Sequence, residues 1–298
     1  MDLYRVAITV LFKILRSIHD AQGMHELFKL FIYSSGMVAS RSLSKWSSIL
    51  LRGIRRGVLL EFLACKLFGS YKLISQDAQY DYVRNRRGIL FVVPKTFSAR
   101  ARADYFYTLD PLTELSIHPF FAMKEGVFVD VGAFLGKYSL EIAKRPGCKV
   151  LGIEPNPESA AILKKNALLN NCSRRLTIAP YAVTETSRTV TLSLDGSTSQ
   201  VVRANKSSTT VTVKGLPILS ILKQYKVDPR SVTLLKIDVE GEQLAILEQV
   251  LRSEHFENAR IICEILADKS RAKTLQFIHG CGYGAEALDD SNYLIVRA

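Results

Sequence analysis

Cysteine is scarce in this sequence, and the few cysteines follow no pairing pattern. The five are Cys65, Cys148, Cys172, Cys263 and Cys281, an odd number, and no two of them form a C-x-x-C motif. A disulfide framework needs paired cysteines, and a zinc ribbon needs two close pairs. The sequence therefore excludes both and suits a reducing compartment.

Long hydrophobic runs are also missing. A membrane-spanning helix needs about 20 predominantly apolar residues, whereas the main apolar run near the N-terminus, Val6–Phe12, lies between Arg5 and Lys13. No small-residue cleavage site follows this run, so the pattern does not favour a signal peptide. We therefore expect a cytoplasmic protein.

Acidic residues are outnumbered by basic ones. There are 28 Asp and Glu against 40 Lys and Arg, which gives a formal net charge of +12. The composition is nevertheless globular, because 48% of the residues are apolar and only 23% are charged. A length of 298 residues suits one large α/β domain with an extension.

The first 75 residues differ from the rest in their hydrophobic pattern. We expect a small helical extension over 1–75 before a domain over 76–298. Apolar residues recur at helical spacing through residues 1–18, and Arg5, Lys13 and Arg16 lie on the other side. One interpretation is that this helix packs on the main domain or on a second subunit. The other is peripheral contact with an anionic membrane surface through residues 1–18.

From residue 126 onward, strand patterns alternate with helix patterns. The predicted strands are 127–131, 149–154, 176–183, 232–239, 259–266, 283–288 and 293–297, and the predicted helices are 137–145, 157–170, 216–225, 243–253 and 270–280. This alternation predicts an α/β fold with a mainly parallel sheet and helices on both faces. The short loop before the last strand places an antiparallel partner at the sheet's edge. Residues 80–84 and 89–93 predict a separate hairpin, and 189–194 and 209–213 an inserted one.

A glycine turn after the first of these strands is the first candidate site. Asp130 ends the strand, and Gly132 and Gly136 bound the turn before the next helix. The spacing Gly132-x-x-x-Gly136 does not match the G-x-G-x-x-G fingerprint of nicotinamide cofactors. A carboxylate at this place would repel a diphosphate and attract an ammonium or sulfonium group.

A second acid follows at the end of the next strand. Glu154 comes 22 residues after Gly132, close to the spacing of about 20 expected for a carboxylate that binds ribose hydroxyls. Pro155-Asn156-Pro157 then ends the strand and begins a helix, since proline is tolerated at the first helical position.

The third cluster is Lys236-Ile237-Asp238-Val239-Glu240-Gly241, where charges interrupt an apolar strand. Side chains alternate along a strand, so Lys236 and Asp238 share a face. A charge buried in a sheet is costly unless it is paired, which favours a functional role over chance. Glu264 ends the next strand in the same way.

The series FVDVGAFLGKYSL, GIEPNP, NALLNN, LLKIDVEGEQLAIL and IICEI resembles the FkbM-type S-adenosylmethionine-dependent methyltransferases over about residues 80–298. The resemblance implies a class I, Rossmann-like methyltransferase fold with a seven-stranded sheet. It also implies methyl transfer, usually to a hydroxyl oxygen. Family members usually have Asn at the position of Phe134.

Site residues are carried over by position. The resemblance implies that Asp130, Gly132 and Gly136 line the methionine part of the cofactor, Glu154 holds the ribose, and Asp238 lies beside the sulfonium. Tyr138, Ser139, Asn156 and Ala182 complete the predicted cofactor site. The predicted catalytic residues, which would orient or deprotonate the acceptor hydroxyl, are Lys236, Asp238 and Glu240. Alternatively, Asp238, Glu240 and Glu264 hold a Mg²⁺ ion that lowers the pKa of the hydroxyl.

The acceptor that the family suggests is a sugar-like, lipid-linked or polyketide-like hydroxyl compound. The charge of +12 leaves a nucleic-acid-modifying methyltransferase as a rival interpretation. A partner-binding protein that keeps the cofactor fold without turnover is a third. The sequence does not indicate an oligomeric state.

Overall fold

A computed structural model describes residues 71–85, 87–96, 118–195, 198–201, 210–239, 241–268 and 270–297. All of them belong to one of the two units into which the chain divides, Glu61–Ala298. The predicted helical extension over 1–75, with its membrane-contacting helix over 1–18, lies outside the described residues except for its last five, which belong to a strand. Within the described ranges, no helix is long and apolar enough to cross a membrane.

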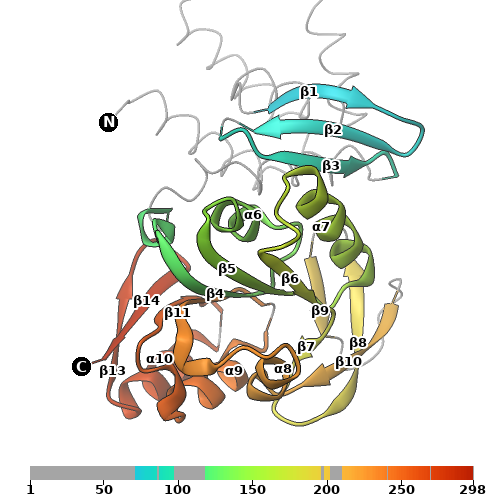
Figure 1. Ribbon diagram of the computed structural model, residues 1–298. Coiled ribbons are helices and arrows are strands. Elements are labelled where there is room, and N and C mark those ends of the chain that lie inside the picture. Colours follow the sequence, from blue (N-terminus) through green and yellow to red (C-terminus); the bar gives the residue numbers. More distant parts are fainter. Residues whose placement is uncertain are drawn as a thin grey trace, which may run out of the picture. The chain divides into compact units, whose positions relative to one another are not determined.

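The main sheet has seven strands in the order β13-β14-β12-β11-β4-β5-β6 (Figure 1). Their bounds are β4 Glu125–Val131, β5 Gly147–Ile153, β6 Leu176–Ala179, β11 Val232–Ile237, β12 Arg260–Glu264, β13 Tyr283–Ala287 and β14 Asn292–Arg297. Neighbouring strands are parallel, except that β14 is antiparallel to both β12 and β13. The predicted mainly parallel sheet is confirmed. The last two strands form an antiparallel pair at the sheet's edge, as expected, with β14 between β12 and the edge strand β13.

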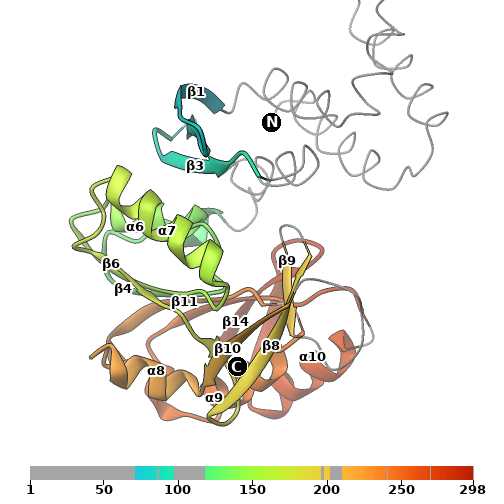
Figure 2. The same ribbon diagram turned by 90° about the vertical axis from the view of Figure 1, so that its right-hand side faces the viewer.

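Helices cover both faces of this sheet, as the alternation predicts (Figure 2). α6 Lys137–Ala143 and α7 Pro157–Leu169 lie on one face, and α8 Ile218–Gln224, α9 Gln243–Leu251 and α10 Arg271–Gly280 lie on the other. Short 3-10 helices occur at η1 His118–Phe121, η2 Pro229–Ser231 and η3 Glu254–Phe256.

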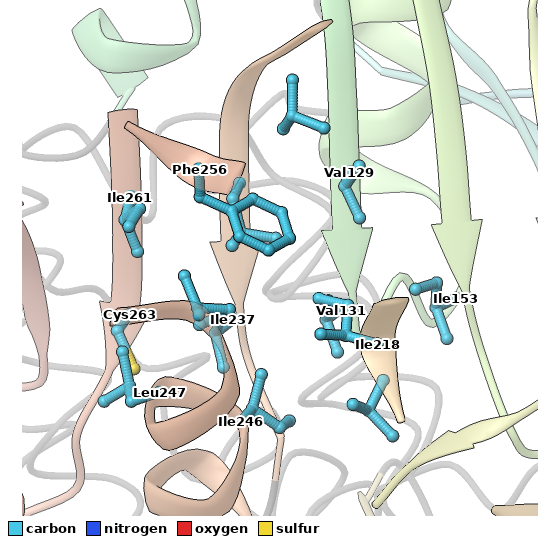
Figure 3. Packing of buried hydrophobic residues seen from close by; sticks show 14 of the residues in the cluster. Val129, Val131, Ile153, Ile218, Ile237, Ile246, Leu247, Phe256, Ile261 and Cys263 are labelled. Atoms are coloured by element: carbon cyan, nitrogen blue, oxygen red, sulfur yellow. The ribbon is translucent and has the colours of Figure 1, made fainter. Parts of the chain in front are cut away.

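Alternating side chains of the central strands divide the core into two clusters. On β4, Phe128 belongs to the cluster beneath α6 and α7, whereas Val129 and Val131 belong to the cluster beneath α8, α9 and α10. Figure 3 shows part of the second cluster, where Ile237 of β11 lies near Ile246 and Leu247 of α9. Because both faces are buried, the central strands read as nearly continuous apolar runs.

Two smaller sheets flank the main one. The first is antiparallel, in the order β1-β2-β3 (β1 Tyr71–Gln76, β2 Tyr80–Asn85, β3 Leu90–Pro94). The second has the order β7-β10-β8-β9 (β7 Ala182–Val183, β8 Arg188–Asp195, β9 Thr198–Val201, β10 Thr210–Leu216). Both predicted hairpins are confirmed as the pairs β2–β3 and β8–β10.

Two strand predictions need correction. The strand expected over 176–183 is two strands, β6 and β7, which belong to different sheets. Pro180 separates them, because proline has no N–H to donate to a ladder. In addition, β1 was not predicted as a strand.

The core allows a simple stability test at Phe128. Its ring is fully buried and meets the Phe121 ring edge to face, with centroids 5.7 Å apart. Phe128→Ala should lower the free energy of unfolding by about 3–5 kcal/mol, because it leaves a cavity. Leu168→Ala, at a side chain that is 60% exposed, should change it by less than about 0.5 kcal/mol. Urea denaturation measures both, and equal losses would contradict this account of the core.

Candidate active site

The carboxyl ends of the central strands bring the predicted site residues to one edge of the main sheet. Asp130 of β4 lies in register with Lys236 of β11 on one side and Gly152 of β5 on the other. Residues in register on neighbouring parallel strands project from the same face. Asp130 and Lys236 are therefore neighbours on the face that α6 and α7 cover.

Lys236 is a buried cation at the centre of this edge. Its side chain is 3% exposed, and its Nζ forms an ion pair with Asp238 Oδ2. The same ammonium group lies 5.4 Å from the centre of the Tyr138 ring, at cation–π distance. A buried charge is costly unless it is paired. The acids around Lys236 therefore also have a structural role, because they neutralise its buried charge.

Lys236 lowers the pKa values of both Asp130 and Asp238, but their net shifts are opposite. Burial raises the pKa of Asp130 to about 6, and Lys236 with a hydrogen bond from Ser139 offsets only part of the effect. Burial also raises the pKa of Asp238, but the Lys236 ammonium and a hydrogen bond with Glu264 outweigh it and hold that pKa below its usual range. Asp238 therefore stays ionised near neutral pH. Its side chain is 37% exposed, so a ligand can reach it.

Asp130 is held from the next helix. Ser139 of α6 donates a hydrogen bond from Oγ to Asp130 Oδ2 at 2.6 Å, and both residues are buried. Gly152 lies beside this contact, and a Cβ there would approach the Ala133 Cβ tightly, at 3.2 Å, while lying at van der Waals distance, 3.4 Å, from Ser139 Oγ. Sequence reasoning missed Gly152. A glycine within an apolar strand was the available signal.

Glu154 follows β5 and is 5% exposed. Its two carboxylate oxygens accept backbone N–H groups from both sides: Oε2 from Phe134 at 2.8 Å and Oε1 from Asn156 at 2.9 Å. Burial raises the pKa of Glu154 to about 7, although these hydrogen bonds act in the other direction. Each oxygen keeps a further lone pair, so the carboxylate can still accept hydroxyl groups of a ligand.

The glycine turn between β4 and α6 has an unusual backbone. Gly132 has φ +86°, and a Cβ there would lie 1.8 Å from the carbonyl oxygen of Asp238. Phe134 has φ 47°, a left-handed conformation that costs a side-chain-bearing residue roughly 1–2 kcal/mol. Asn adopts this conformation more easily than Phe, so Phe134 is strained at a position where the resemblance implies Asn.

The remaining predicted residues lie at different distances from this edge. Asn156 caps α7 by accepting the N–H groups of Glu158 and Ser159, and Tyr138 stacks on Phe121 with ring centroids 4.0 Å apart. Ala182 lies on β7, and its side chain packs in the core of the four-stranded sheet. Glu240 lies outside the described residues. The functional roles of all the predicted site residues stay predictions.

The family assignment follows from a comparison with protein-family models. The model of the methyltransferase FkbM domain matches residues 130–284, which is more than half of the chain. The chain belongs to the FkbM methyltransferase family. Its reaction is therefore methyl transfer and its cofactor S-adenosylmethionine, as its motifs predicted. The predicted class I, Rossmann-like fold is confirmed by the seven-stranded sheet and its helices.

Other comparisons gave distant similarities. The chain is similar to M. jannaschii TYW2 in complex with AdoMet at 12% identity, over 76% of this chain and 87% of that one, with a TM-score of 0.38. P. horikoshii TYW2 in complex with MeSAdo is 14% identical over 81% of both chains, with a TM-score of 0.40. The precorrin-6y C5,15-methyltransferase of Geobacter metallireducens is 14% identical over 62% of this chain and 86% of that one, also with a TM-score of 0.40. No curated protein matches the sequence.

The close approach at Gly132 gives a testable prediction. Gly132→Ala forces a Cβ into the Asp238 carbonyl and should lower the free energy of unfolding by at least about 3 kcal/mol. The matched control is Gly241→Ala, where φ is +88° but nothing lies within 4 Å of a built Cβ. It should cost only about 1–2 kcal/mol, because the backbone penalty acts alone. Equal losses in urea denaturation would show that contact with Asp238 does not constrain the turn.

The raised pKa values of Asp130 and Glu154 predict how stability depends on pH without ligand. The folded chain binds protons at these groups more tightly than the unfolded chain, whose values are near 3.8 and 4.5. Stability should therefore fall as pH rises through this window up to about 7, by up to about 3 kcal/mol for Glu154.

Urea midpoints from pH 5 to pH 8 measure this dependence. Glu154→Gln cannot titrate at this position, so its stability should fall less steeply with pH than that of the unaltered chain. Stability of the unaltered chain that rises from pH 5 to pH 7 would contradict the assigned directions.

Proposed function

We propose that this methyltransferase transfers the methyl group to a hydroxyl oxygen of a small-molecule acceptor. The observation that carries the proposal is the pair of Lys236 and Asp238 at the carboxyl edge of the sheet. The buried ammonium keeps the partly exposed carboxylate ionised. An ionised carboxylate accepts hydrogen bonds, and a hydroxyl group is a suitable donor.

The residues around the glycine turn fit S-adenosylmethionine. Gly132 and Gly136 let the turn pack closely against the Asp238 carbonyl and the Leu163 side chain, where a Cβ would not fit. Glu154 retains lone pairs for the two ribose hydroxyls. Asp130 and Ser139 fix the two ends of the turn, since β4 precedes it and α6 follows it. Asn156, Tyr138 and Ala182 complete the proposed cofactor site. When bound, the cofactor supplies a methyl group already activated on a sulfonium.

The chain's own residues must then align the acceptor oxygen and take its proton. Asp238 accepts the hydroxyl's hydrogen bond, and this contact fixes the direction of the oxygen. The low pKa of Asp238 makes it a weak base by itself. Its proposed role is therefore to orient the hydroxyl, and Glu240 is proposed to take the proton. Lys236 holds Asp238 in place, and Glu240 is the third proposed catalytic residue.

A magnesium-assisted version of the same chemistry uses Asp238, Glu240 and Glu264 as ligands. Within the part of the chain that the structure describes, no group of three or more His, Cys, Asp or Glu residues is placed to hold a metal. Asp238 and Glu264 interact, and Glu240 is not among the described residues. Loss of activity with EDTA and its return with Mg²⁺ would favour this version.

The acceptor we propose is a sugar-like, lipid-linked or polyketide-like hydroxyl compound. A lipid-linked acceptor would bring the chain to a membrane surface, where the basic helix predicted over residues 1–18 would support binding. A screen of hydroxyl acceptors with labelled S-adenosylmethionine, followed by mass spectrometry of the product, tests the proposal. Methylation confined to nitrogen or carbon, or to an RNA included in the screen, would overturn it.

The role of Asp238 can be tested by removing its charge. Asp238→Asn should reduce turnover at saturating cofactor by about 10²–10⁴-fold, the range typical of a positioned acid or base. It should weaken cofactor binding as well, because Asp238 is also predicted to lie beside the sulfonium. Glu286→Gln, an equivalent change at an exposed residue of the edge strand β13, should leave turnover unchanged. If Asp238→Asn retains full turnover with intact folding, Asp238 serves only to neutralise Lys236.

A further inference from the structure

Two asparagines lie about one helical turn apart at the end of α7: Asn166 in its last turns and Asn170, its C-cap residue. Residues at this spacing lie on the same face of a helix. Both side chains contact the edge of β3 that faces away from β2. They join segments 74 and 80 residues apart in the sequence.

The two amides pair with the backbone of β3 as a fourth strand would. Asn170 Oδ1 accepts the Leu90 N–H at 3.0 Å, and its Nδ2 donates to the Leu90 carbonyl at 2.7 Å. Asn166 Oδ1 accepts the Val92 N–H at 2.8 Å. Leu90 and Val92 are two residues apart, so their N–H groups point to the same side of the strand. The small sheet is thereby fixed to α7 by backbone groups of β3.

Asn166 differs from Asn170 in a second contact. Its Nδ2 donates to the carbonyl oxygen of Leu135 at 2.9 Å, inside the glycine turn. The Asn166 side chain is fully buried and uses one end of its amide for β3 and the other for the turn. It therefore sets the spacing between the small sheet and the turn.

The place of this contact in the turn is significant. Phe134 holds a left-handed backbone, and its N–H is bound by Glu154. The carbonyl of the next residue is bound by Asn166. Glu154 and Asn166 thus bind the backbone before and after the strained Phe134. Glu154 is also the carboxylate proposed to bind the ribose. The backbone N–H groups of Gly132 and Ala133 also donate to the Ile153 carbonyl. A turn without the Asn166 contact would lose the described side-chain hydrogen bond to its Leu135 carbonyl.

We infer that Asn166 is a positioning residue for cofactor binding, which holds the turn at Leu135 in its ligand-ready conformation and links it to the β1–β3 sheet. This inference rests on the cofactor site of the proposed function, not on the nature of the acceptor. It assigns Asn166 no contact with the cofactor, because its effect passes through the turn.

The test compares Asn166→Ala with Asn170→Ala, since both remove an amide from β3 and only the first removes the donor to the turn. Calorimetry with S-adenosylmethionine and urea denaturation are performed on both full-length variants. Asn166→Ala should weaken cofactor binding about tenfold, as expected for the loss of a buried hydrogen bond. Asn170→Ala should bind within about twofold of the unaltered chain while losing stability.

A second variant covers the case in which Asn166→Ala does not fold. Asn166→Asp keeps the shape of the side chain and the oxygen that accepts the Val92 N–H. It replaces the Nδ2 donor that faces the Leu135 carbonyl with a carboxylate oxygen. It should also raise the cofactor dissociation constant and the KM for the cofactor, with kcat at saturation changed little. Affinity like that of the unaltered chain in a folded Asn166 variant, or an equal loss in both asparagine variants, would overturn the inference.

These measurements are distinguishable from a failure of the proposed function. If the unaltered chain binds S-adenosylmethionine but methylates no hydroxyl, the acceptor proposal fails and the comparison of the two asparagines still decides the role of Asn166. Absence of cofactor binding by the unaltered chain would remove the basis of both.

Discussion

A lysine buried in the middle of a sheet is the constraint on which the rest of this site depends. Lys236 is 3% exposed on its side chain and occupies a position that a parallel sheet normally fills with an apolar residue. Its charge must be neutralised within a few ångströms. Asp238 supplies the anion, whereas Asp130 is buried more deeply and holds its proton more tightly. The balance between burial and the attraction of Lys236 thus makes Asp238 an ionised, accessible acid and Asp130 a buried acid with a raised pKa.

The second constraint is steric, and it acts at the glycine turn between β4 and α6. The backbone after β4 passes so close to the backbone after β11 that Gly132 has no room for a side chain. Residue 134 then takes a left-handed conformation. Glu154 and Asn166 bind the turn from opposite ends of this residue. The preorganised shape is therefore a property of several elements, β4, β5, β11 and α7, acting together.

Much of this was readable from the sequence, for identifiable reasons. Strands buried on both faces give apolar runs, and acids at their ends, such as Asp130, Glu154 and Asp238, stand out against them. The sequence did not reveal β1, the insertion of β14 beside β12, or the division at Pro180, because strand pairing depends on partners far along the chain. The asparagine contacts were hidden for the same reason. The motif around Asn166 was visible, but β3 lies more than 70 residues earlier.

The edge of β3 has a consequence for assembly. An exposed strand edge is a template on which another chain can add a strand. Asn166 and Asn170 occupy the backbone groups of Leu90 and Val92, so this edge is not free to serve as such a template. A strand from another chain could pair with β3 here only by displacing these two amides, one of which also binds the glycine turn.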